Sequence, residues 1–93
     1  MQEEKFITIQ ENKIRYLEDG ASSNVIMLVH GLGASAERWD HVIPYFRKDY
    51  RVIALDLPGF GLSDKPSIDY TIDFFVRSLS EFIESLGIQN SIL

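Results

Sequence analysis

The sequence predicts an α/β fold in which an antiparallel hairpin is followed by a parallel strand–helix–strand–helix arrangement. The first observation is the stretch 4–18, where two short segments of alternating apolar and polar residues flank a turn. The second is a pair of continuous apolar runs, 25–29 and 51–55, which are typical of strands covered on both faces. The third is a helical spacing of apolar residues between these runs and again over 71–86.

The chain has the composition of a folded protein. Its 93 residues suffice for one small domain or for part of a larger one. Hydrophobic residues make up 45% and charged residues 25%, so disorder is not expected. The 14 acidic and 9 basic residues give a net charge of -5, whereas a nucleic-acid-binding protein usually presents a basic face. We therefore expect no nucleic-acid partner.

No targeting or membrane-spanning segment is expected. The N-terminus, 1–5, is charged, whereas a signal peptide begins with a basic and then an apolar region. The longest apolar run, 25–29, is much shorter than the ~20 residues that a membrane-spanning helix needs. Cysteine is absent, which excludes a disulfide framework and a thiol nucleophile. The charged N-terminus and the lack of a long apolar run predict a cytoplasmic chain with no membrane partner.

The hairpin over 4–18 is expected to be an edge element with one face in water. In its second half, Ile14 and Arg15 belong to opposite faces because side chains alternate along a strand. The two halves flank Glu11-Asn12. A two-residue connection of this kind predicts a tight turn in which Asn12 takes a positive φ.

The stretch 25–55 is expected to form a crossover unit of strand, helix and strand, which is right-handed and parallel in nearly all proteins. The predicted helix covers 36–48, with Ser35 as its N-cap. Pro44 predicts a break within it, because proline lacks the backbone donor that a continuous helix needs. The helical apolar stripe consists of Trp39, Val42, Ile43 and Phe46.

A long loop over 56–70 separates this unit from a second helix over 71–86. Thr71 is the expected N-cap of that helix, and Gly87 the expected left-handed residue at its end. The segment 91–93 is interpreted as the start of a further strand. The apolar stripe of the second helix consists of Phe75, Leu79, Phe82, Ile83 and Leu86.

A glycine-rich turn directly follows the first buried strand. Its sequence is His30-Gly31-Leu32-Gly33. Parallel strands of an open sheet bring ligands to their carboxyl ends, and glycines let the backbone expose its N–H groups there. The amide of Leu32 or Gly33 can then stabilise a developing negative charge. A simple strand-to-helix turn without a catalytic role explains this tetrapeptide equally well.

A dinucleotide-binding module is an alternative interpretation of the same turn. Gly31, Gly33 and Ala36 fit a variant of the glycine fingerprint, and Asp56 stands where an acid that binds ribose belongs. Two observations weigh against it: a histidine precedes the first glycine, and an antiparallel hairpin precedes the strand.

Two motifs together carry a family resemblance. The first is the turn described above followed by Trp39, and the second is Asp56-Leu57-Pro58-Gly59-Phe60-Gly61-Leu62-Ser63-Asp64-Lys65-Pro66. At this separation, each after a strand, they resemble the N-terminal part of an α/β-hydrolase fold enzyme, a group that includes esterases and C–C bond hydrolases. The resemblance extends over essentially the whole chain.

The resemblance implies roles for particular residues. Leu32 supplies a backbone N–H to an oxyanion hole, and Gly31, Gly33 and Trp39 lie near the substrate. A packing role for Trp39 is equally compatible with its place on an apolar stripe. His30 is expected to hold the turn by a hydrogen bond. No cofactor is implied, and the partner of the full-length enzyme is a small-molecule substrate.

The chain departs from the family pattern in one large respect. The family's nucleophile sits on a Gly-x-Ser-x-Gly elbow after the next strand, and here that strand has only begun at Ser91. The segment 61–65 is no substitute, because its last glycine is missing and no strand precedes its serine. Only two histidines, His30 and His41, are present. We therefore expect the chain alone to be inactive, with a serine or aspartate nucleophile beyond Leu93.

Self-association is the remaining expectation. In the family's strand order, the strand 51–55 lies between the hairpin and the strand 25–29. The strand 25–29 then has an open apolar edge, which is a template for association. We expect contacts through this edge, through the stub 91–93, or through both, and a non-catalytic fragment that associates in this way is a further alternative function.

Overall fold

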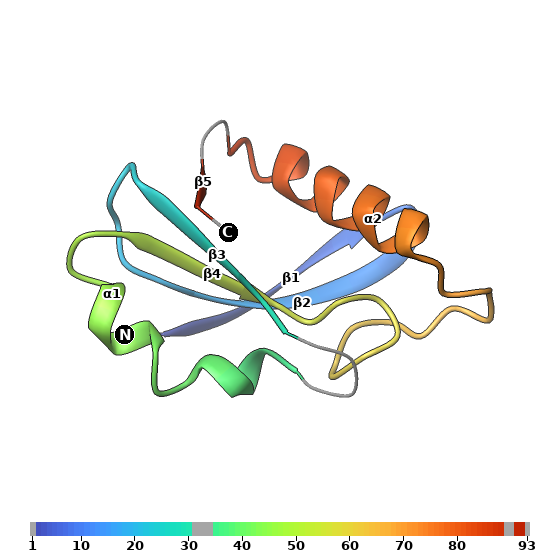
Figure 1. Cartoon of the computed structure of the whole chain (residues 1–93), viewed down its shortest axis with the longest axis horizontal. Helices are drawn as coiled ribbons and strands as arrows, with labels where there is room; N and C mark the ends of the chain where they lie inside the picture. Colours follow the sequence, from blue (N-terminus) through green and yellow to red (C-terminus); the bar gives the residue numbers. More distant parts are fainter. Residues whose placement is uncertain (1, 31–34, 89–90, 93) are drawn as a thin grey trace.

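The computed structural model describes residues 2–30, 35–88 and 91–92, and its centre is a five-stranded mixed sheet in the order β1-β2-β4-β3-β5 (Figure 1). β2 pairs antiparallel with β1 and β4, whereas β3 pairs parallel with β4 and β5. This topology confirms the predicted fold class, an antiparallel hairpin followed by a parallel arrangement. The strands are β1 (Glu3–Ile9), β2 (Asn12–Asp19), β3 (Val25–Val29), β4 (Arg51–Leu55) and β5 (Ser91–Ile92).

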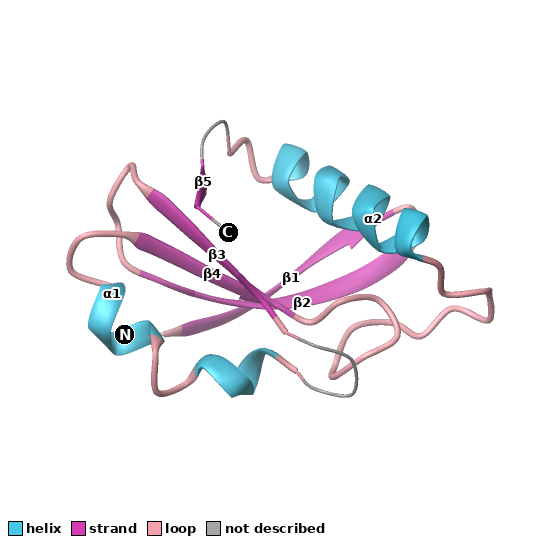
Figure 2. Ribbon diagram, in the orientation of Figure 1, coloured by secondary structure: helices cyan, strands magenta, loops and turns pink. Residues whose placement is uncertain are grey.

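Helices cover both faces of the sheet (Figure 2). α2 (Ile72–Ser85) lies across one face, and the short helices η1 (Ala36–Trp39) and α1 (Ile43–Phe46) lie on the other. The predicted helix over 36–48 is therefore two pieces. The break comes before Pro44, which lies in the first turn of α1. Proline is tolerated there because the backbone N–H groups of a first turn have no acceptor within the helix.

The hairpin turn is one residue earlier than predicted. Ile9 pairs with Asn12, so Gln10 and Glu11 are the two central residues of the turn. Both have positive φ values, 50° and 68°, as a two-residue turn between twisted strands requires. Asn12 is instead the first residue of β2, and its side-chain amide donates to the carbonyl oxygen of Gln10 at 3.2 Å.

The prediction of a water-exposed face on the hairpin is wrong for β2. Arg15 and Leu17, on the face opposite Ile14, are only 4% and 3% exposed. β2 has β1 on one side and β4 on the other, so it is an inner strand of the sheet. Of the two hairpin strands only β1 is at an edge of the sheet, and the helices cover both faces beside β2.

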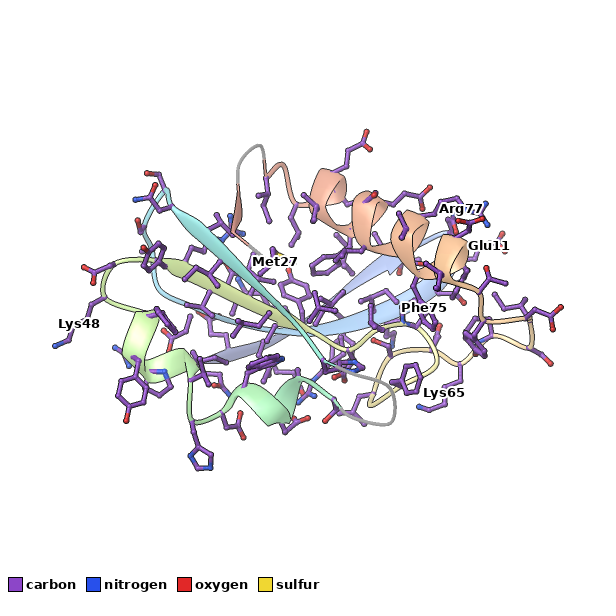
Figure 3. All side chains as sticks on the ribbon, in the orientation of Figure 1. Glu11, Met27, Lys48, Lys65, Phe75 and Arg77 are labelled. Atoms are coloured by element: carbon purple, nitrogen blue, oxygen red, sulfur yellow. The ribbon has the colours of Figure 1, made fainter. Side chains whose placement is uncertain are left out.

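Two apolar layers hold the structure together. Between the sheet and α2, Met27 and Phe82 are each 1% exposed, and Phe82 makes an edge-on ring contact with Tyr16 at 5.2 Å. Figure 3 shows Met27 and Phe75 in this interior, while Lys48 points outward. A second cluster lies under η1 and α1. Its buried members are Leu17, Ala36, Ile43, Val52 and Ala54.

Both ends of α2 follow from local sequence. The Thr71 hydroxyl accepts from the amide of Phe74 at 3.1 Å, so Thr71 is the N-cap. At the other end Gly87 has φ +69°, and Ile88 N–H donates to the carbonyl oxygen of Ile83 at 3.2 Å, which is the Schellman arrangement. Among the described residues, neither α2 nor any shorter helix is long and apolar enough to cross a membrane.

Candidate active site

The carboxyl ends of β3 and β4 bring the two sequence motifs together. Val29 pairs with Leu55, so the residues that follow these strands, His30 and Asp56, leave the sheet side by side. This is the edge of a parallel sheet at which ligands are usually bound.

Three of the predicted site residues, Gly31, Leu32 and Gly33, lie outside the described residues. Their assigned roles in the oxyanion hole and in substrate binding stay predictions. The structure describes His30 before them and Ser35 after them. The description of the site therefore rests on the residues that flank the turn and on the hydrogen bonds that hold these residues in place.

His30 ties the end of β3 to the end of β4. Its side chain is buried, and Nε2 accepts a hydrogen bond from the amide of Leu57 at 3.0 Å. A ring nitrogen that accepts from an amide carries no proton, so this nitrogen has a structural role. The ring also makes an edge-on contact with Phe60 at 5.7 Å. The predicted hydrogen bond of His30 is thus present, and it joins the ends of β3 and β4.

The carboxylate of Asp56 is fully buried and accepts three hydrogen bonds. Oδ1 accepts from the amide of Ala36 at 2.6 Å. Oδ2 accepts from the amide of Leu62 at 2.9 Å and from Nη1 of Arg15 at 3.2 Å. Asp56 therefore faces into the protein, and it does not present its carboxylate to a ribose as the dinucleotide interpretation requires.

The loop after β4 is built around the same carboxylate. Gly61 has φ +54°, and a Cβ placed on it would overlap the side chain of Asp56. Ser63 is 2% exposed; its hydroxyl donates to the carbonyl oxygen of Asp56 at 2.6 Å and accepts from the amide of Arg15 at 2.8 Å. Gly61 and Ser63 thus have structural roles in this loop, and the Ser63 hydroxyl is not placed as a nucleophile.

Arg15 connects these elements through its guanidinium group. Nη1 donates to Oε1 of Glu37 at 2.9 Å, Nη2 pairs with the other oxygen of that carboxylate, and Nε donates to Glu4 at 3.1 Å. The hydrogen bonds from Arg15 lower the pKa of Glu37 to about 2. The hydrogen bond with Glu37 raises the pKa of Arg15, although burial opposes this.

Sequence reasoning missed Arg15 and Glu37 as partners. It expected one face of the hairpin to lie in water and assigned no ionic partner to Arg15. The predicted cap is also absent: the Ser35 hydroxyl donates to Glu37 at 2.8 Å and makes no capping bond to the helix backbone. An arginine between apolar neighbours in a strand was the available signal, because such a residue needs anionic partners when the strand is an inner one.

Trp39 packs against the apolar cluster under η1 and α1. Its indole Nε1 is buried and has no hydrogen-bond partner among the residues that the structure describes, although buried indole N–H groups usually have one. The packing role is therefore directly visible. Its predicted position beside the substrate stays a prediction.

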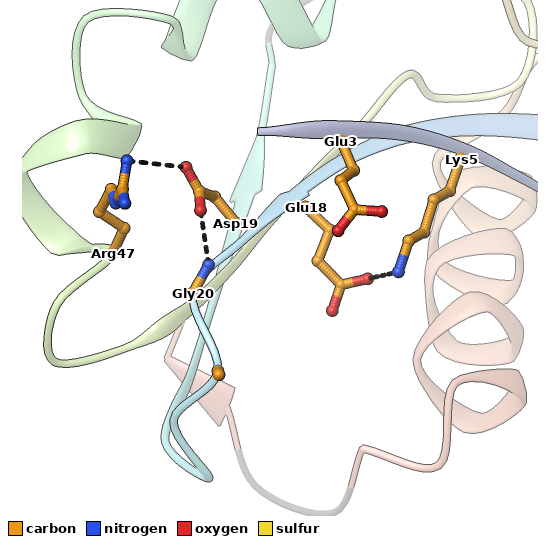
Figure 4. Close-up of a pocket in the computed structure, with 7 residues that line it drawn as sticks. Glu3, Lys5, Glu18, Asp19, Gly20 and Arg47 are labelled. Atoms are coloured by element: carbon orange, nitrogen blue, oxygen red, sulfur yellow. Dashed lines mark hydrogen bonds and ion pairs between the residues drawn. The ribbon is translucent and has the colours of Figure 1, made fainter. Parts of the chain in front are cut away.

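Two hollows between described residues lie away from this edge. One, of about 380 Å³, is lined mostly by charged side chains from the start of β1, from the end of β2 and from Arg47 (Figure 4). Four of its charged side chains form ion pairs: Lys5 with Glu18 at 3.0 Å, and Arg47 with Asp19 at 3.9 Å. The other, of about 480 Å³, is lined by Thr8, Ile9, Gln10, Glu81, Glu84 and Ser85.

The charges in the first hollow stabilise one another. Burial raises the pKa of Glu18, but hydrogen bonds from Arg51 and Lys5 outweigh it, so the net shift is downward. Throughout the described part of the chain, His, Asp and Glu side chains form no group of three or more that could hold a metal ion. We assign no ligand to either hollow.

Comparison with known proteins identifies relatives of this arrangement. The family model described as alpha/beta hydrolase fold matches residues 24–93. The chain is 42% identical over 92 residues to a 2-hydroxy-6-oxo-6-(2'-aminophenyl)hexa-2,4-dienoic acid hydrolase from Metapseudomonas resinovorans, covering 96% of this chain and 31% of the relative. It is 38% identical over 87 residues to a haloalkane dehalogenase from Mesorhizobium japonicum, covering 94% and 28%.

Solved structures agree with the sequence relatives. A membrane phospholipase A described as a bacterial virulence factor superposes with a TM-score of 0.92 at 32% identity, over 97% of this chain and 30% of that protein. A haloalkane dehalogenase variant from Bradyrhizobium elkanii superposes with a TM-score of 0.91 at 27% identity, over 98% and 30%. The chain thus spans less than a third of the length of these relatives.

Proposed function

Because this chain belongs to the α/β-hydrolase fold family, we propose that it supplies oxyanion-hole backbone and part of the pocket wall to a hydrolase of ester-like or related small molecules. The observation that carries the proposal is the anchoring of the turn after β3 on both sides. His30 accepts from Leu57, and Ala36 donates to Asp56. Anchored flanks suit a turn whose amides must be preorganised for a developing charge.

In this proposal the amide of Leu32 donates to the oxygen that becomes negative when a nucleophile attacks the substrate. Gly31 and Gly33 allow the backbone to approach the substrate closely, and Trp39 backs the pocket wall. The nucleophile, the general base and the orienting acid come from outside these 93 residues, because the sequence contains no Gly-x-Ser-x-Gly and only two histidines.

The relatives support a hydrolytic class of reaction without specifying the bond. One is named a dienoic acid hydrolase, another a haloalkane dehalogenase and a third, from Caenorhabditis elegans, an epoxide hydrolase. The part that these proteins share with the present chain is 31%, 28% and 25% of their respective lengths, and in this proposal it precedes the nucleophile. We therefore propose a small organic substrate attacked by a side-chain nucleophile, with no cofactor.

The first test uses the chain by itself. We expect a p-nitrophenyl ester to be hydrolysed at the rate of buffer alone. Turnover that disappears in Ser63→Ala or His30→Ala would contradict the proposal that this chain lacks a complete active site. Titration with NAD or FAD tests the dinucleotide alternative, and we expect no binding because the Asp56 carboxylate is enclosed.

The second test places the chain in a complete enzyme. The corresponding 31% of the Metapseudomonas hydrolase is replaced by this chain, and turnover of that enzyme's substrate is measured. Leu32→Pro removes the proposed donor, and we expect kcat to fall by about 10²–10³-fold, the usual cost of losing one oxyanion-hole donor. Leu32→Ala is the matched control because it keeps the N–H. Equal activity of the two variants would refute the role of Leu32.

A further inference from the structure

We propose that Asp56 is a positioning residue for this site: its carboxylate holds the start of η1 against the end of β4, and so sets where the turn after β3 ends. The inference rests on the proposed function, because that turn carries the proposed oxyanion-hole donor. Asp56 itself touches no substrate in this scheme. It acts through the backbone of Ala36.

The contact between Asp56 and Ala36 is short and shielded from water. Oδ1 lies 2.6 Å from the amide nitrogen of Ala36, and both residues are 0% exposed. The next residue along the chain, Leu57, donates its amide to His30 at 3.0 Å. Two consecutive residues at the end of β4 therefore anchor both flanks of the turn, His30 at its entry and Ala36 at its exit.

The carboxylate is itself held in one orientation. Oδ2 accepts from Leu62 at 2.9 Å and from Arg15 at 3.2 Å, and hydrogen bonds between charged groups are the stronger kind. Gly61 has no side chain to displace it. Arg15 in turn binds Glu37, which lies within η1, so the network closes on the same element that Asp56 anchors.

This arrangement predicts which kinetic constant depends on Asp56. Backbone donors stabilise a transition state only when they are already in place, and a displacement of about 1 Å can cost about 10²-fold in rate. The substrate's ground state makes weaker demands on these donors. Loss of the Asp56–Ala36 contact therefore lowers kcat and leaves KM nearly unchanged.

Two substitutions separate this contact from the rest of the network. Asp56→Ala removes all three hydrogen bonds. Asp56→Asn keeps one carbonyl oxygen for the amide of Ala36 but places an amide donor against the N–H groups of Leu62 and Arg15. Asp64→Asn is the matched control, since Asp64 accepts from the amide of Lys13 at 2.7 Å in the same loop and is remote from Ala36 in sequence.

The kinetic experiment uses the chimaeric hydrolase described above. We expect Asp56→Ala to lower kcat by about 10²-fold with KM within about 2-fold, and Asp56→Asn to stay within about 10-fold in kcat. Asp64→Asn should leave both constants unchanged. Affinity for a trifluoromethyl ketone, which forms an oxyanion when attacked, should fall in parallel with kcat.

A second measurement covers variants that fold poorly. In the 93-residue chain, amide hydrogen exchange at Ala36 should stay slow in Asp56→Asn and become fast in Asp56→Ala, relative to the amides of β4. The inference is overturned if Asp56→Ala loses no more kcat than Asp64→Asn, or if Ala36 exchanges rapidly in Asp56→Asn. Failure of Leu32→Pro to affect the chimaera refutes the proposed function, whereas failure of Asp56→Ala alone refutes only the inference.

Discussion

Arg15 on β2 and Asp56 after β4 form an ion pair in the interior, with Nη1 and Oδ2 3.2 Å apart and side-chain exposures of 5% and 0%. They are 41 residues apart in the chain. Their pairing joins the hairpin to the edge of the parallel strands. The paired carboxylate of Asp56 is also the group around which the long loop after β4 folds.

Removing Arg15 should be among the most destabilising substitutions in this protein. Arg15→Met leaves the carboxylate of Asp56 buried without its cation, and breaking a buried pair in this way costs about 3–5 kcal/mol of unfolding free energy. Urea denaturation measures the loss. Lys5→Met is the control: Lys5 is 42% exposed in its ion pair with Glu18, and such pairs contribute about 0–1 kcal/mol. An equal loss of unfolding free energy in the two variants would show that burial of the Arg15–Asp56 pair does not make its loss more destabilising.

Acid should weaken the fold in a range that Glu37 helps to set. Its pKa is lowered from 4.5 to about 2 in the folded state, first of all by the hydrogen bonds from Arg15. A lowered pKa means that Glu37 stabilises the fold above pH 4.5 and loses this contribution as the pH falls toward 2. Glu37→Gln should therefore narrow the difference in unfolding free energy between about pH 5 and about pH 2, as followed by circular dichroism. An unchanged difference would exclude a role for Glu37 in the acid response.

Two glycines with similar backbone angles should respond differently to alanine. Gly87 has φ +69°, and a Cβ added there would meet no atom within 4 Å, so Gly87→Ala should cost only the left-handed conformation, about 1–2 kcal/mol. Gly61 has φ +54°, and its Cβ would overlap the Asp56 carboxylate, so Gly61→Ala should cost about 1–3 kcal/mol more. Thermal unfolding of both variants measures the two losses of stability. Similar losses would mean that the loop around Gly61 shifts readily to make room for the added Cβ.

We propose that the chain self-associates through the edge of β3. On the side away from β4, β5 pairs only with Val25 and Ile26, and in the described part of the chain the apolar segment 27–29 has no strand there. Light scattering should show mass rising with concentration, and Val29→Lys should suppress it because a charge protects an open edge. Val76→Lys on the exposed face of α2 is the control. Suppression by Val76→Lys alone would place the contact on α2 instead.

Local patterns were sufficient for the elements and their order. The runs 25–29 and 51–55 are parallel neighbours in the sheet, as predicted. Thr71 and Gly87 mark the start and the end of α2, also as predicted. These features were predictable because apolar spacing, capping and left-handed residues act over a few positions. The hairpin turn was misplaced by one residue. Asparagine favours positive φ, but the pairing of the two strands selected Gln10 and Glu11.

The amino-acid pattern was enough to identify the α/β arrangement of a hydrolase family, because strand-end motifs and apolar periods are local properties. It took the packing of the whole chain to make Arg15 an interior residue and to direct Asp56 at Ala36 rather than at a ligand. Alternation along β2 distinguishes its two faces but does not tell what covers them. What surrounds β2 depends on β4, η1 and their neighbours, which come much later in the chain. Their packing buries the Arg15 cation and the Asp56 carboxylate, which become partners of each other.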